Sequence, residues 1–526
     1  MNANPNPGLN ENDGPNQNHG QNPNHSQNPN HSQNPNQNQN QNQKTAEGTH
    51  MTTSEAGQPA RCPVDHGAAA APVVIPATAL PGSKKHAVVQ LFNYWTNPQA
   101  FIEGCRKEYG PRFQLSIRLP PRPVYVLTTP DDVKAMFTAP ADVLHTGNGS
   151  ATIEKYTGQS GLAWLDEDAH KARRKAMMPS YHGGALERIS QAITETVRTD
   201  VATWPRNTPV QLHSHIHSFT MNVIREVIYG PKGPSRWTEL HRLLLEMMEF
   251  NNGPVSPMLL HKMPARMVKV LRAIRPLGLE RFLTLRDQVD ALVYESIEEH
   301  RAAGYRGDDL LSELLEMTHP DGTPLTDSEI RDEMSTIFLA GTETTAAAIA
   351  WAFVYLARDK DVTARVREEM ARGEETYLTA VVNEVLRLRP SIPNIIVREV
   401  KKPIEIGGVR YEPGQHLWAS AFLLNRDPNL YEDPDVFRPE RFLGVKPGTY
   451  SWIPFGGGRI RCLGDRIALL EMKAVIREVL GQCDLHVGEG EPERARSRIV
   501  VNVPSDFARM ELRSRVAAEA AEGVRS

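Results

Sequence analysis

The chain has 526 residues, and its 59 Lys and Arg nearly balance its 63 Asp and Glu, which leaves a formal net charge of -4. This balance excludes the strongly charged character expected of a general binder of nucleic acid or anionic membranes, so we predict neither as a partner. The four cysteines form no CxxC pair, which fits a reducing cytoplasm. No apolar run is long enough to span a bilayer, and we therefore predict a cytoplasmic protein without a membrane segment.

Residues 1–50 consist mainly of Asn, Gln, Pro, Gly and His, with near-repeats such as Asn-Pro-Asn-His-Ser. Such a composition cannot bury a core, so we predict a disordered, low-complexity segment. Its junction with Met51 resembles a cloning scar, and we interpret the segment as a fused solubility tag rather than a metal-binding tract. Residues 51–80 form a flexible leader rich in Pro and Ala. We expect one folded domain over 81–513 and a C-terminal tail over 514–526.

The first part of the domain combines helix and strand patterns. The expected elements are, in order, a helix at Asn97–Tyr109, paired strands at Phe113–Leu119 and Val124–Leu127, a helix opened by Pro130, a Gly/Thr/Ser-rich loop at 145–161, and a mainly helical stretch at 186–315. Helical periodicity breaks near Asn251 and at Pro264. The apolar stretch Val255–Met263 lies between these breaks and is a candidate lid.

The second part contains the longest predicted helix. Thr326 and Glu329 form a capping box, and the helix that they open runs to about Ala357, roughly 48 Å at about 1.5 Å per residue. The later elements are a helix at Thr376–Leu388, a hairpin at Ile404–Tyr411 with a Gly-Gly turn, and a strand at Ser497–Asn502. These patterns predict a mainly α fold with small β-sheets.

The middle of this long helix has an unusual composition. The stretch Ala340–Thr345 combines glycine with several threonines, which are poor residues for a helix interior. The Thr344 hydroxyl can donate to the Ala340 carbonyl and locally open the helix. Beside a metal, an opened turn makes room for O₂ and for a proton-carrying water. The alternative is a helix–helix contact through small residues.

Three further patterns bring acids and bases together. His170 and Arg174 are four residues apart on a predicted helix, so they can donate to one carboxylate, although a solvated basic face is the alternative. Glu384 and Arg387 share a helical face, which alone is a weak signal. It gains meaning beside the later stretch Phe437–Phe442, which contains Arg441.

A glycine-rich loop places Cys462 at the start of a predicted helix that has an apolar face. The helix dipole and free loop N–H groups favour a thiolate there. Three consecutive glycines, Gly456–Gly458, let the backbone pass close to a flat group. A thiolate under a planar cofactor indicates haem iron, while an ordinary glycine-rich turn is the alternative.

The pattern Phe455-x-x-Gly458-x-x-x-Cys462-x-Gly464 resembles the haem-ligand loop of the cytochrome P450 family. The resemblance implies the P450 fold, with haem b between the long central helix and the helix that follows the Cys loop. Cys462 would be the axial thiolate ligand of the iron, and Phe455 and Gly458 would contact the haem. The stretch Ala340–Thr345 is similar to the oxygen-activation motif, which makes Glu343 the catalytic acid and Thr344 the catalytic alcohol.

The resemblance, which covers about Pro81 to Arg513, also implies the residues around the haem propionates. His170, Arg174 and Arg398 match propionate ligands. Ile460 departs from the family pattern, because Arg or His usually stands two residues before the cysteine. The last implication is structural: a buried network that supports the Cys loop would be formed by Glu384, Arg387 and Arg441.

The resemblance implies a monomeric haem-thiolate monooxygenase that uses O₂ and two electrons to hydroxylate or otherwise oxidise a lipophilic small molecule, either a fatty acid or a secondary-metabolite scaffold. A separate ferredoxin or flavodoxin, with its reductase, would supply the electrons. We expect the ferredoxin or flavodoxin to dock on a basic face formed by Lys171, Arg173, Lys175, Arg459, Arg461, Arg466 and Lys473. The alternatives are an H₂O₂-dependent peroxygenase and a non-catalytic haem sensor or carrier.

Overall fold

The computed structural model describes residues 74–117, 122–146, 153–250, 270, 278–498 and 500–515. The predicted tag, most of the leader, the candidate lid Val255–Met263 and most of the tail lie outside these residues. The chain divides into two units, Met1–Ala69 and Ala70–Ser526, and every described residue belongs to the second. All that follows concerns this second unit.

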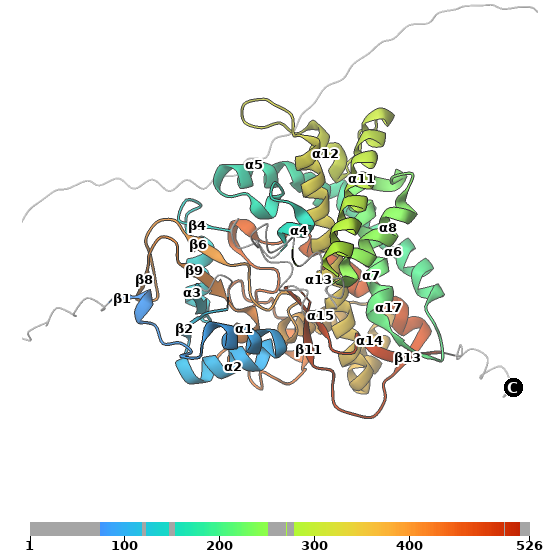
Figure 1. Cartoon of the computed structure of the whole chain (residues 1–526). Coiled ribbons are helices and arrows are strands. Elements are labelled where there is room, and N and C mark those ends of the chain that lie inside the picture. The colour runs from blue at the N-terminus through green and yellow to red at the C-terminus, as the bar shows by residue number, and fades with distance from the viewer. Residues whose placement is uncertain are drawn as a thin grey trace, which may run out of the picture. The chain divides into compact units, whose positions relative to one another are not determined.

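Helices dominate the described residues, in agreement with the predicted fold class. Their bounds are α1 Ala87–Thr96, α2 Pro98–Tyr109, α3 Pro130–Thr138, α4 Glu154–Thr157, α5 Glu167–Met177, α6 Gly183–Thr203, α7 Leu212–Tyr229, α8 Trp237–Glu249, α11 Leu279–Ala303, α12 Leu310–Glu316, α13 Asp327–Arg358, α14 Lys360–Ala371, α15 Thr376–Leu388, α16 Ala421–Leu424 and α17 Asp465–Gln482. Figure 1 shows α13 running through the middle of the helices, with α6, α7, α8, α11 and α17 gathered on one side.

The strands form small sheets. Their bounds are β1 Ile75–Pro76, β2 Arg112–Leu115, β3 Val124–Leu127, β4 Leu144–His145, β5 Pro209–Gln211, β6 Arg398–Val400, β7 Ile404–Ile406, β8 Val409–Tyr411, β9 His416–Ala419, β10 Cys483–His486, β11 Ala495–Arg498, β12 Val501–Pro504 and β13 Arg509–Ser514. The described sheets have the orders β2-β3-β9-β6-β4, β1-β8-β7, β10-β13-β5 and β11-β12. The first two lie beside α1, α2 and α3 on the side opposite α6 and α7 (Figure 1).

Local signals explain where the main helices begin. Asn97 caps α2 by accepting a hydrogen bond from the Ala100 N–H, and Pro98 occupies the first helical turn. The predicted capping box of Thr326 and Glu329 is present at the start of α13. The predicted bounds of α15 are also confirmed.

One strand prediction is wrong. The stretch Ser497–Asn502 is not a single strand, because β11 ends at Arg498, β12 begins at Val501, and Ser497 pairs with Asn502 across the hairpin. The residues between Arg498 and Asn502 are β-branched and include neither Gly nor Pro, so the sequence contains no turn signal there. The hairpin packs on α13, where the Trp351 indole donates to the Asn502 carbonyl over 3.0 Å.

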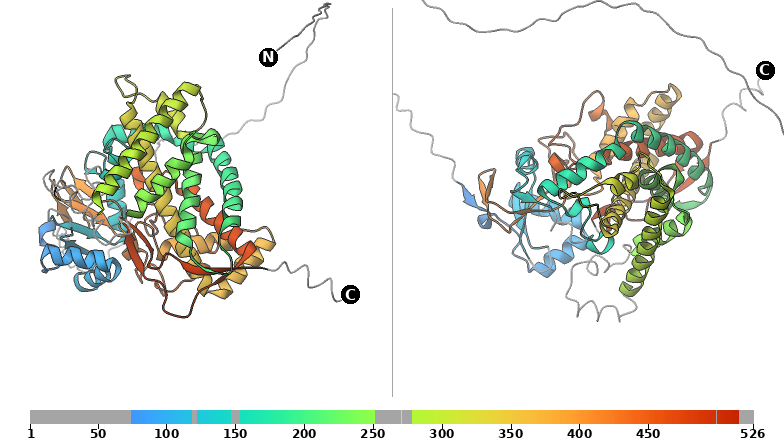
Figure 2. Two further views of the ribbon diagram at one scale, coloured as in Figure 1. Left: turned by 45° about the vertical axis from the view of Figure 1, so that its right-hand side comes forward. Right: turned by 90° about the horizontal axis from the view of Figure 1, so that it is seen from above.

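The helix α13 is the centre of the core. It contacts α7, α15 and α17, which the two views of Figure 2 also show around it. By length and composition it is the one described helix that could cross a membrane, so the expectation that no apolar run is long enough to span a bilayer was wrong. In its most apolar window, however, 78% of the residues are buried inside the protein, as in the central helix of a globular core.

Candidate functional site

The loop before α17 is fixed against α3. A Cβ atom at Gly457 would lie 2.3 Å from the Phe137 ring, and one at Gly458 would lie 2.2 Å from the Phe137 carbonyl oxygen. Gly458 also has a φ of 65°, which favours glycine. The Cys462 N–H donates to the Phe455 carbonyl over 3.0 Å, which closes the loop. These contacts place the cysteine three residues before the start of α17.

The Cys462 side chain is exposed although protein surrounds it. Desolvation by that protein is the main reason its pKa is raised, while the Gly464 N–H and the nearby Arg174 and Arg461 act in the opposite direction. A side chain can be both accessible and desolvated when it faces an inner space lined by protein. A metal ion with vacant coordination would favour the thiolate over the neutral thiol. Cys105 and Cys483 differ from Cys462, because both are buried.

The predicted hydrogen bond in α13 is present. Thr344 Oγ1 donates to the Ala340 carbonyl over 2.7 Å. The predicted local opening is not observed, because α13 continues without a break from Asp327 to Arg358. Ala340 is nevertheless exposed and Thr344 half-buried, within a helix whose other residues are mostly buried. The helix α13 packs against α17, which begins three residues after the exposed cysteine.

Glu343 lies on a different face of α13 from Thr344. It is buried, and its Oε1 atom is 3.1 Å from the Arg498 guanidinium and 3.3 Å from His217 Nε2. Burial alone would raise the pKa of Glu343, but Arg498 and His217 outweigh burial and lower it to about 2. Glu343 is therefore an ionised carboxylate. Sequence analysis missed both partners, since they lie far from Glu343 along the chain.

The predicted propionate ligands form a basic cluster with one addition. Arg398 on β6 is fully buried, and none of its three guanidinium nitrogens has a hydrogen-bond partner among the described residues. Burial and the nearby Arg459 lower the pKa of Arg398 to about 9. Burial, Arg174 and Arg459 lower the pKa of His170 to about 4. These groups oppose one another's positive charge, so the cluster is suited to an anion.

This cluster provides the test of whether a haem fits. A buried, unpaired guanidinium costs several kcal/mol, about 3–5 when one partner of a buried pair is removed, so its retention indicates an anionic partner. Haem carries two propionate carboxylates, and Arg398 presents all its donors without a protein acceptor among the described residues. Together with the accessible Cys462 thiol, these residues fit a haem.

The neighbours of Ile460 explain how the loop tolerates an apolar residue there. Arg459 donates to the backbone carbonyls of Ala139 and Leu144 and acts electrostatically on Arg398 and His170. Arg461 instead turns to Asp465 at 2.8 Å. Arg459 therefore supplies the positive charge that the family pattern places one residue later. The only sequence signal was an arginine directly beside the divergent position.

The supporting network is confirmed. Glu384 and Arg387 are fully buried and joined at 2.7 Å, and Arg441 Nε reaches Glu384 at 3.0 Å. Arg387 also donates to the carbonyls of Asn425 and Pro434, which precede the Cys loop. The network ties α15 to the chain leading into that loop, so its role is structural.

The predicted docking face is smaller than expected. Arg173 is buried and bonded to Glu333 at 3.0 Å, and Lys473 is paired with Glu375 at 2.7 Å. Arg459 and Arg461 are also engaged in the contacts given above. The exposed basic side chains that remain are Lys171, Lys175 and Arg466. Helical spacing could not show that Arg173 points inward, because its buried acidic partner is remote in sequence.

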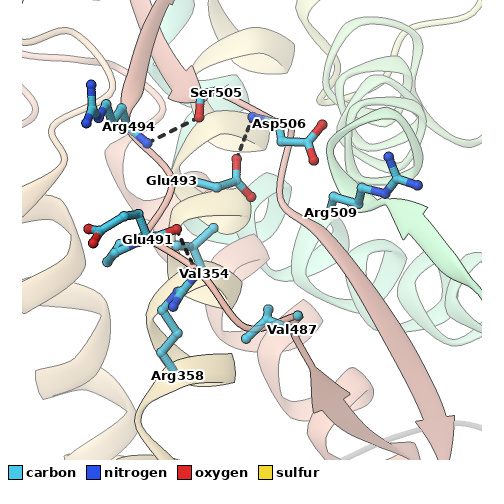
Figure 3. Close-up of a pocket in the computed structure, with 11 residues that line it drawn as sticks. Val354, Arg358, Val487, Glu491, Glu493, Arg494, Ser505, Asp506 and Arg509 are labelled. Atoms are coloured by element: carbon cyan, nitrogen blue, oxygen red, sulfur yellow. Dashed lines mark hydrogen bonds between the residues drawn. The ribbon is translucent and has the colours of Figure 1, made fainter.

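A separate pocket of about 350 Å³ lies at the C-terminal end of α13 (Figure 3). Val354 and Arg358 line it from α13, and Glu493 and Ser505 line it from the C-terminal segment. Several of its polar groups satisfy one another, as in the hydrogen bond from the Asp506 N–H to Glu493. Val354 is ten residues beyond Thr344, roughly 15 Å along the helix axis. This pocket is therefore distinct from the candidate site.

Comparisons with known proteins agree with this geometry. A family model described as "Cytochrome P450" matches residues 81–508. The chain is 36% identical over 413 residues to cytochrome P450 137 of Mycobacterium tuberculosis, which covers 77% of this chain and 84% of that protein. It is 29% identical to cytochrome P450 135B1 of Mycobacterium bovis, covering 82% of this chain and 91% of that protein. The solved structure "Retinoic acid bound cyanobacterial CYP120A1" superposes with a TM-score of 0.71 at 22% identity, covering 84% of this chain and all of that one, and shares the fold. The chain therefore belongs to the cytochrome P450 family, whose members bind a haem through a cysteine thiolate and generally act as monooxygenases.

Proposed function

We propose that this chain is a haem-thiolate monooxygenase in which Cys462 is the axial ligand, and that it oxidises a lipophilic small molecule with electrons from a separate ferredoxin or flavodoxin. The observation that carries the proposal is the pairing of an accessible Cys462 with a buried Arg398 that has no protein partner among the described residues. A thiolate ligand donates electron density to haem iron and favours O–O cleavage when the haem is bound.

The protein groups around the haem have separate tasks in this proposal. Cys462 holds the iron, and Arg398, His170, Arg174 and Arg459 bind the propionates. Gly458 keeps the loop close to α3, since any side chain there would meet the Phe137 backbone. Phe455 lies at the start of the loop, where the Arg461 guanidinium is 5.9 Å from its ring.

Thr344 and Glu343 handle protons. The Thr344 hydroxyl is held by its bond to the Ala340 carbonyl and can rotate to donate elsewhere. Its own carbonyl accepts from Ser391 over 2.7 Å, which fixes the backbone at this point. Glu343, the adjacent residue, is an ionised carboxylate that can accept a hydrogen bond from a proton-carrying water. This pairing favours a reaction that consumes protons, because H₂O₂ would bring its own.

Apolar side chains beside α13 support a lipophilic substrate. Ala347, Val501 and Val503 form a small buried cluster against which Ile392 and Phe507 pack. Asn394 donates to the Tyr94 hydroxyl over 3.3 Å, and its Oδ1 atom has no partner among the described residues. A fatty acid and a secondary-metabolite scaffold both remain in this class.

We also propose that the chain consists of a tag at 1–50, a leader at 51–80, a catalytic domain at 81–513 and a tail at 514–526. The protein would act as a monomer in the cytoplasm. The alternatives are a peroxygenase, which H₂O₂ alone would drive, and a haem sensor or carrier, which would bind haem without turnover with any electron source.

The test of the proposal uses the reduced carbonyl complex. Cys462→Ala should lose the red-shifted absorbance that marks thiolate ligation, while Cys105→Ala and Cys483→Ser, as matched controls, should keep it. Retention of the band by Cys462→Ala would show that another group ligates the iron.

A further inference from the structure

The segment 158–162, between α4 and α5, carries little buried apolar surface. Its residues are Gly, Gln, Ser, Gly and Leu, and among these five only Gly161 is buried. A segment of this kind opens easily unless other bonds hold it in place. Its attachment to the central helix α13 is polar, and two consecutive acidic residues of that helix provide it.

These two residues, Asp332 and Glu333, accept hydrogen bonds from the backbone of the segment. Asp332 Oδ2 accepts from the N–H groups of Gln159 and Ser160, both over 3.0 Å. Glu333 Oε2 accepts from the Leu162 N–H over 2.8 Å. We refer to Asp332 and Glu333 as the acidic clamp, because together they hold the backbone of the segment at three positions.

The segment comes close to α13 at two glycines. Gly158 has a φ of 69°, a conformation that favours glycine, and a Cβ atom there would collide with the Asp332 carboxylate. A Cβ atom at Gly161 would lie 2.6 Å from Thr336 Oγ1, which is closer than ordinary contact allows. The two glycines therefore permit the approach on which the acidic clamp depends.

The two carboxyl oxygens of Glu333 have unequal surroundings. Oε2 accepts a second hydrogen bond, from the Arg173 guanidinium of α5 over 3.0 Å. Oε1 is buried and has no hydrogen-bond partner among the described residues. An ionised carboxylate accepts hydrogen bonds at both oxygens, whereas a carboxylic acid accepts at one oxygen and carries its proton on the other. The surroundings of Glu333 are therefore those of a neutral acid with its proton on Oε1.

The charged and titratable groups that face Glu333 agree with this assignment. Burial raises the pKa of Glu333 to about 7 and is opposed by Arg173, while Asp332 on the same helix adds a smaller increase. The Tyr181 hydroxyl, in the turn after α5, is within electrostatic range and has no hydrogen-bond partner among the described residues. Glu329, one turn earlier on α13, is 3.8 Å from Arg173, so the guanidinium keeps an acidic partner when Glu333 is neutral.

We propose that the acidic clamp is a pH-sensitive conformational switch, in which residues 158–162 lift off α13 as Glu333 gives up its proton. When the segment lifts, water reaches the Glu333 carboxyl group. The Oε1–H bond then breaks, its electron pair stays on oxygen, and the proton passes to that water. Because the open state solvates the carboxylate, opening is easier at high pH than at low pH.

The switch is connected to the helix that carries the proposed propionate residues. Arg173 and the Leu162 N–H share one oxygen of Glu333, so the same carboxyl group holds both the segment and α5. Arg173 is also directly followed by Arg174 in α5. Opening of the segment therefore changes the bonds of a residue that adjoins the haem-binding cluster.

Site-resolved amide hydrogen exchange of the purified protein measures the opening at several pH values between about pH 5 and about pH 8. Protection factors, which are corrected for the intrinsic pH dependence of exchange, are compared among the wild type, Glu333→Gln and the matched control Asp332→Asn. The glutamine keeps the shape and the acceptor of the neutral acid but has no proton to release. Amides of the β2–β3 pairing serve as the internal reference. No turnover is needed, so the result does not depend on the proposed function.

In the wild type, the protection factor of the Leu162 amide should fall by roughly 30–100-fold between about pH 5 and about pH 8, because each unit of pKa difference between the closed and open states changes the opening equilibrium tenfold. In Glu333→Gln the protection factor should stay at the wild-type value for low pH throughout. Asp332→Asn should lower protection of the segment by one factor at every pH and keep the pH dependence.

Three outcomes overturn the proposal. In the first, the wild-type protection factor of the Leu162 amide does not change with pH. In the second, the pH dependence persists in Glu333→Gln, which would assign it to another titratable group. In the third, the β2–β3 amides lose protection in parallel, which would show that the whole protein loosens as pH rises. The first and third outcomes are read from the wild type alone, so the proposal can be refuted even if Glu333→Gln does not fold.

Discussion

Arg398→Met should have opposite effects on the protein without haem and on the protein with haem. In the protein alone, the Arg398 guanidinium is fully buried and without a partner among the described residues, and burial lowers its pKa from the ordinary value of arginine to about 9. At about 1.36 kcal/mol per pKa unit, this drop corresponds to a destabilisation of about 5 kcal/mol at neutral pH. Methionine removes the charge and keeps the volume, so the apoprotein should become more stable.

The haem-bound protein should respond in the other direction. There Arg398 would bind a propionate, and a charge-assisted hydrogen bond contributes about 1.5–3 kcal/mol. Arg398→Met should therefore weaken haem retention by roughly 10–100-fold. Haem transfer to apomyoglobin measures retention, and urea unfolding of apo- and holoprotein measures stability.

The pH dependence provides a second check on the same residue. The folded-state pKa of Arg398 is depressed, so the unfolded chain binds more protons than the folded chain between about pH 9 and the ordinary pKa of arginine. Apoprotein stability should consequently rise with pH from about pH 9 upward, and the Met variant should lack this rise.

The matched control is Arg426→Met. Arg426 is also largely buried, with its pKa lowered to about 10, but it donates to the Leu388 carbonyl and pairs with Asp435. This change should alter the stability of both forms by the same amount and leave haem retention unchanged, because Arg426 is not among the residues proposed to bind the propionates. If Arg398→Met destabilised the apoprotein, the guanidinium would have a partner there and the argument from an uncompensated charge would fail.

Other changes have similarly defined outcomes. Thr344→Ala should keep NAD(P)H consumption in a reconstituted system but release more H₂O₂, since proton delivery loses its hydroxyl; unchanged coupling would remove Thr344 from the mechanism. Burial raises the pKa of Glu471 well above its ordinary value, so the stability of the wild type should fall as pH rises above the unfolded-state pKa of about 4.3. Glu471→Gln should flatten this pH dependence, which urea unfolding at several pH values measures. Lys175→Glu and Arg466→Glu should slow stopped-flow reduction by a ferredoxin and reduce its sensitivity to salt; rates indifferent to both would place the donor elsewhere.

Local signals in the sequence were sufficient for much of the fold. Capping residues and helical periodicity gave α2, α13 and α15 nearly to the residue. The hairpin inside Ser497–Asn502 escaped prediction because the residues between Arg498 and Asn502 are β-branched and include neither Gly nor Pro. The direction of Arg173 escaped for a different reason: its acidic partner, Glu333, is 160 residues away.

In the candidate site, too, some features can be predicted from nearby residues and others depend on the fold. The Thr344 hydroxyl bonds to a carbonyl four residues away and the Cys462 N–H to a carbonyl seven residues away, and such local neighbours are visible in a sequence. The environment of Glu343 depends on α7 and β11, which only the fold brings together. Arg459 could be seen beside Ile460, but its direction could not be read from the sequence, because the carbonyls that hold it lie after α3.

The five-stranded sheet decides where the buried guanidinium points. Arg398 is paired with Leu417 on β9, and Val400, on the same face of β6, is paired with Leu144 on β4. A shift of one residue in a strand sends each side chain to the opposite face. One residue inserted within β6 would therefore turn Arg398 away from the haem region, whereas one inserted at the Gly407–Gly408 turn would leave it in place. For anyone grafting or recombining segments of this protein, the pairing between β6 and β9 is a junction to keep intact, and the β7–β8 turn is a place to cut.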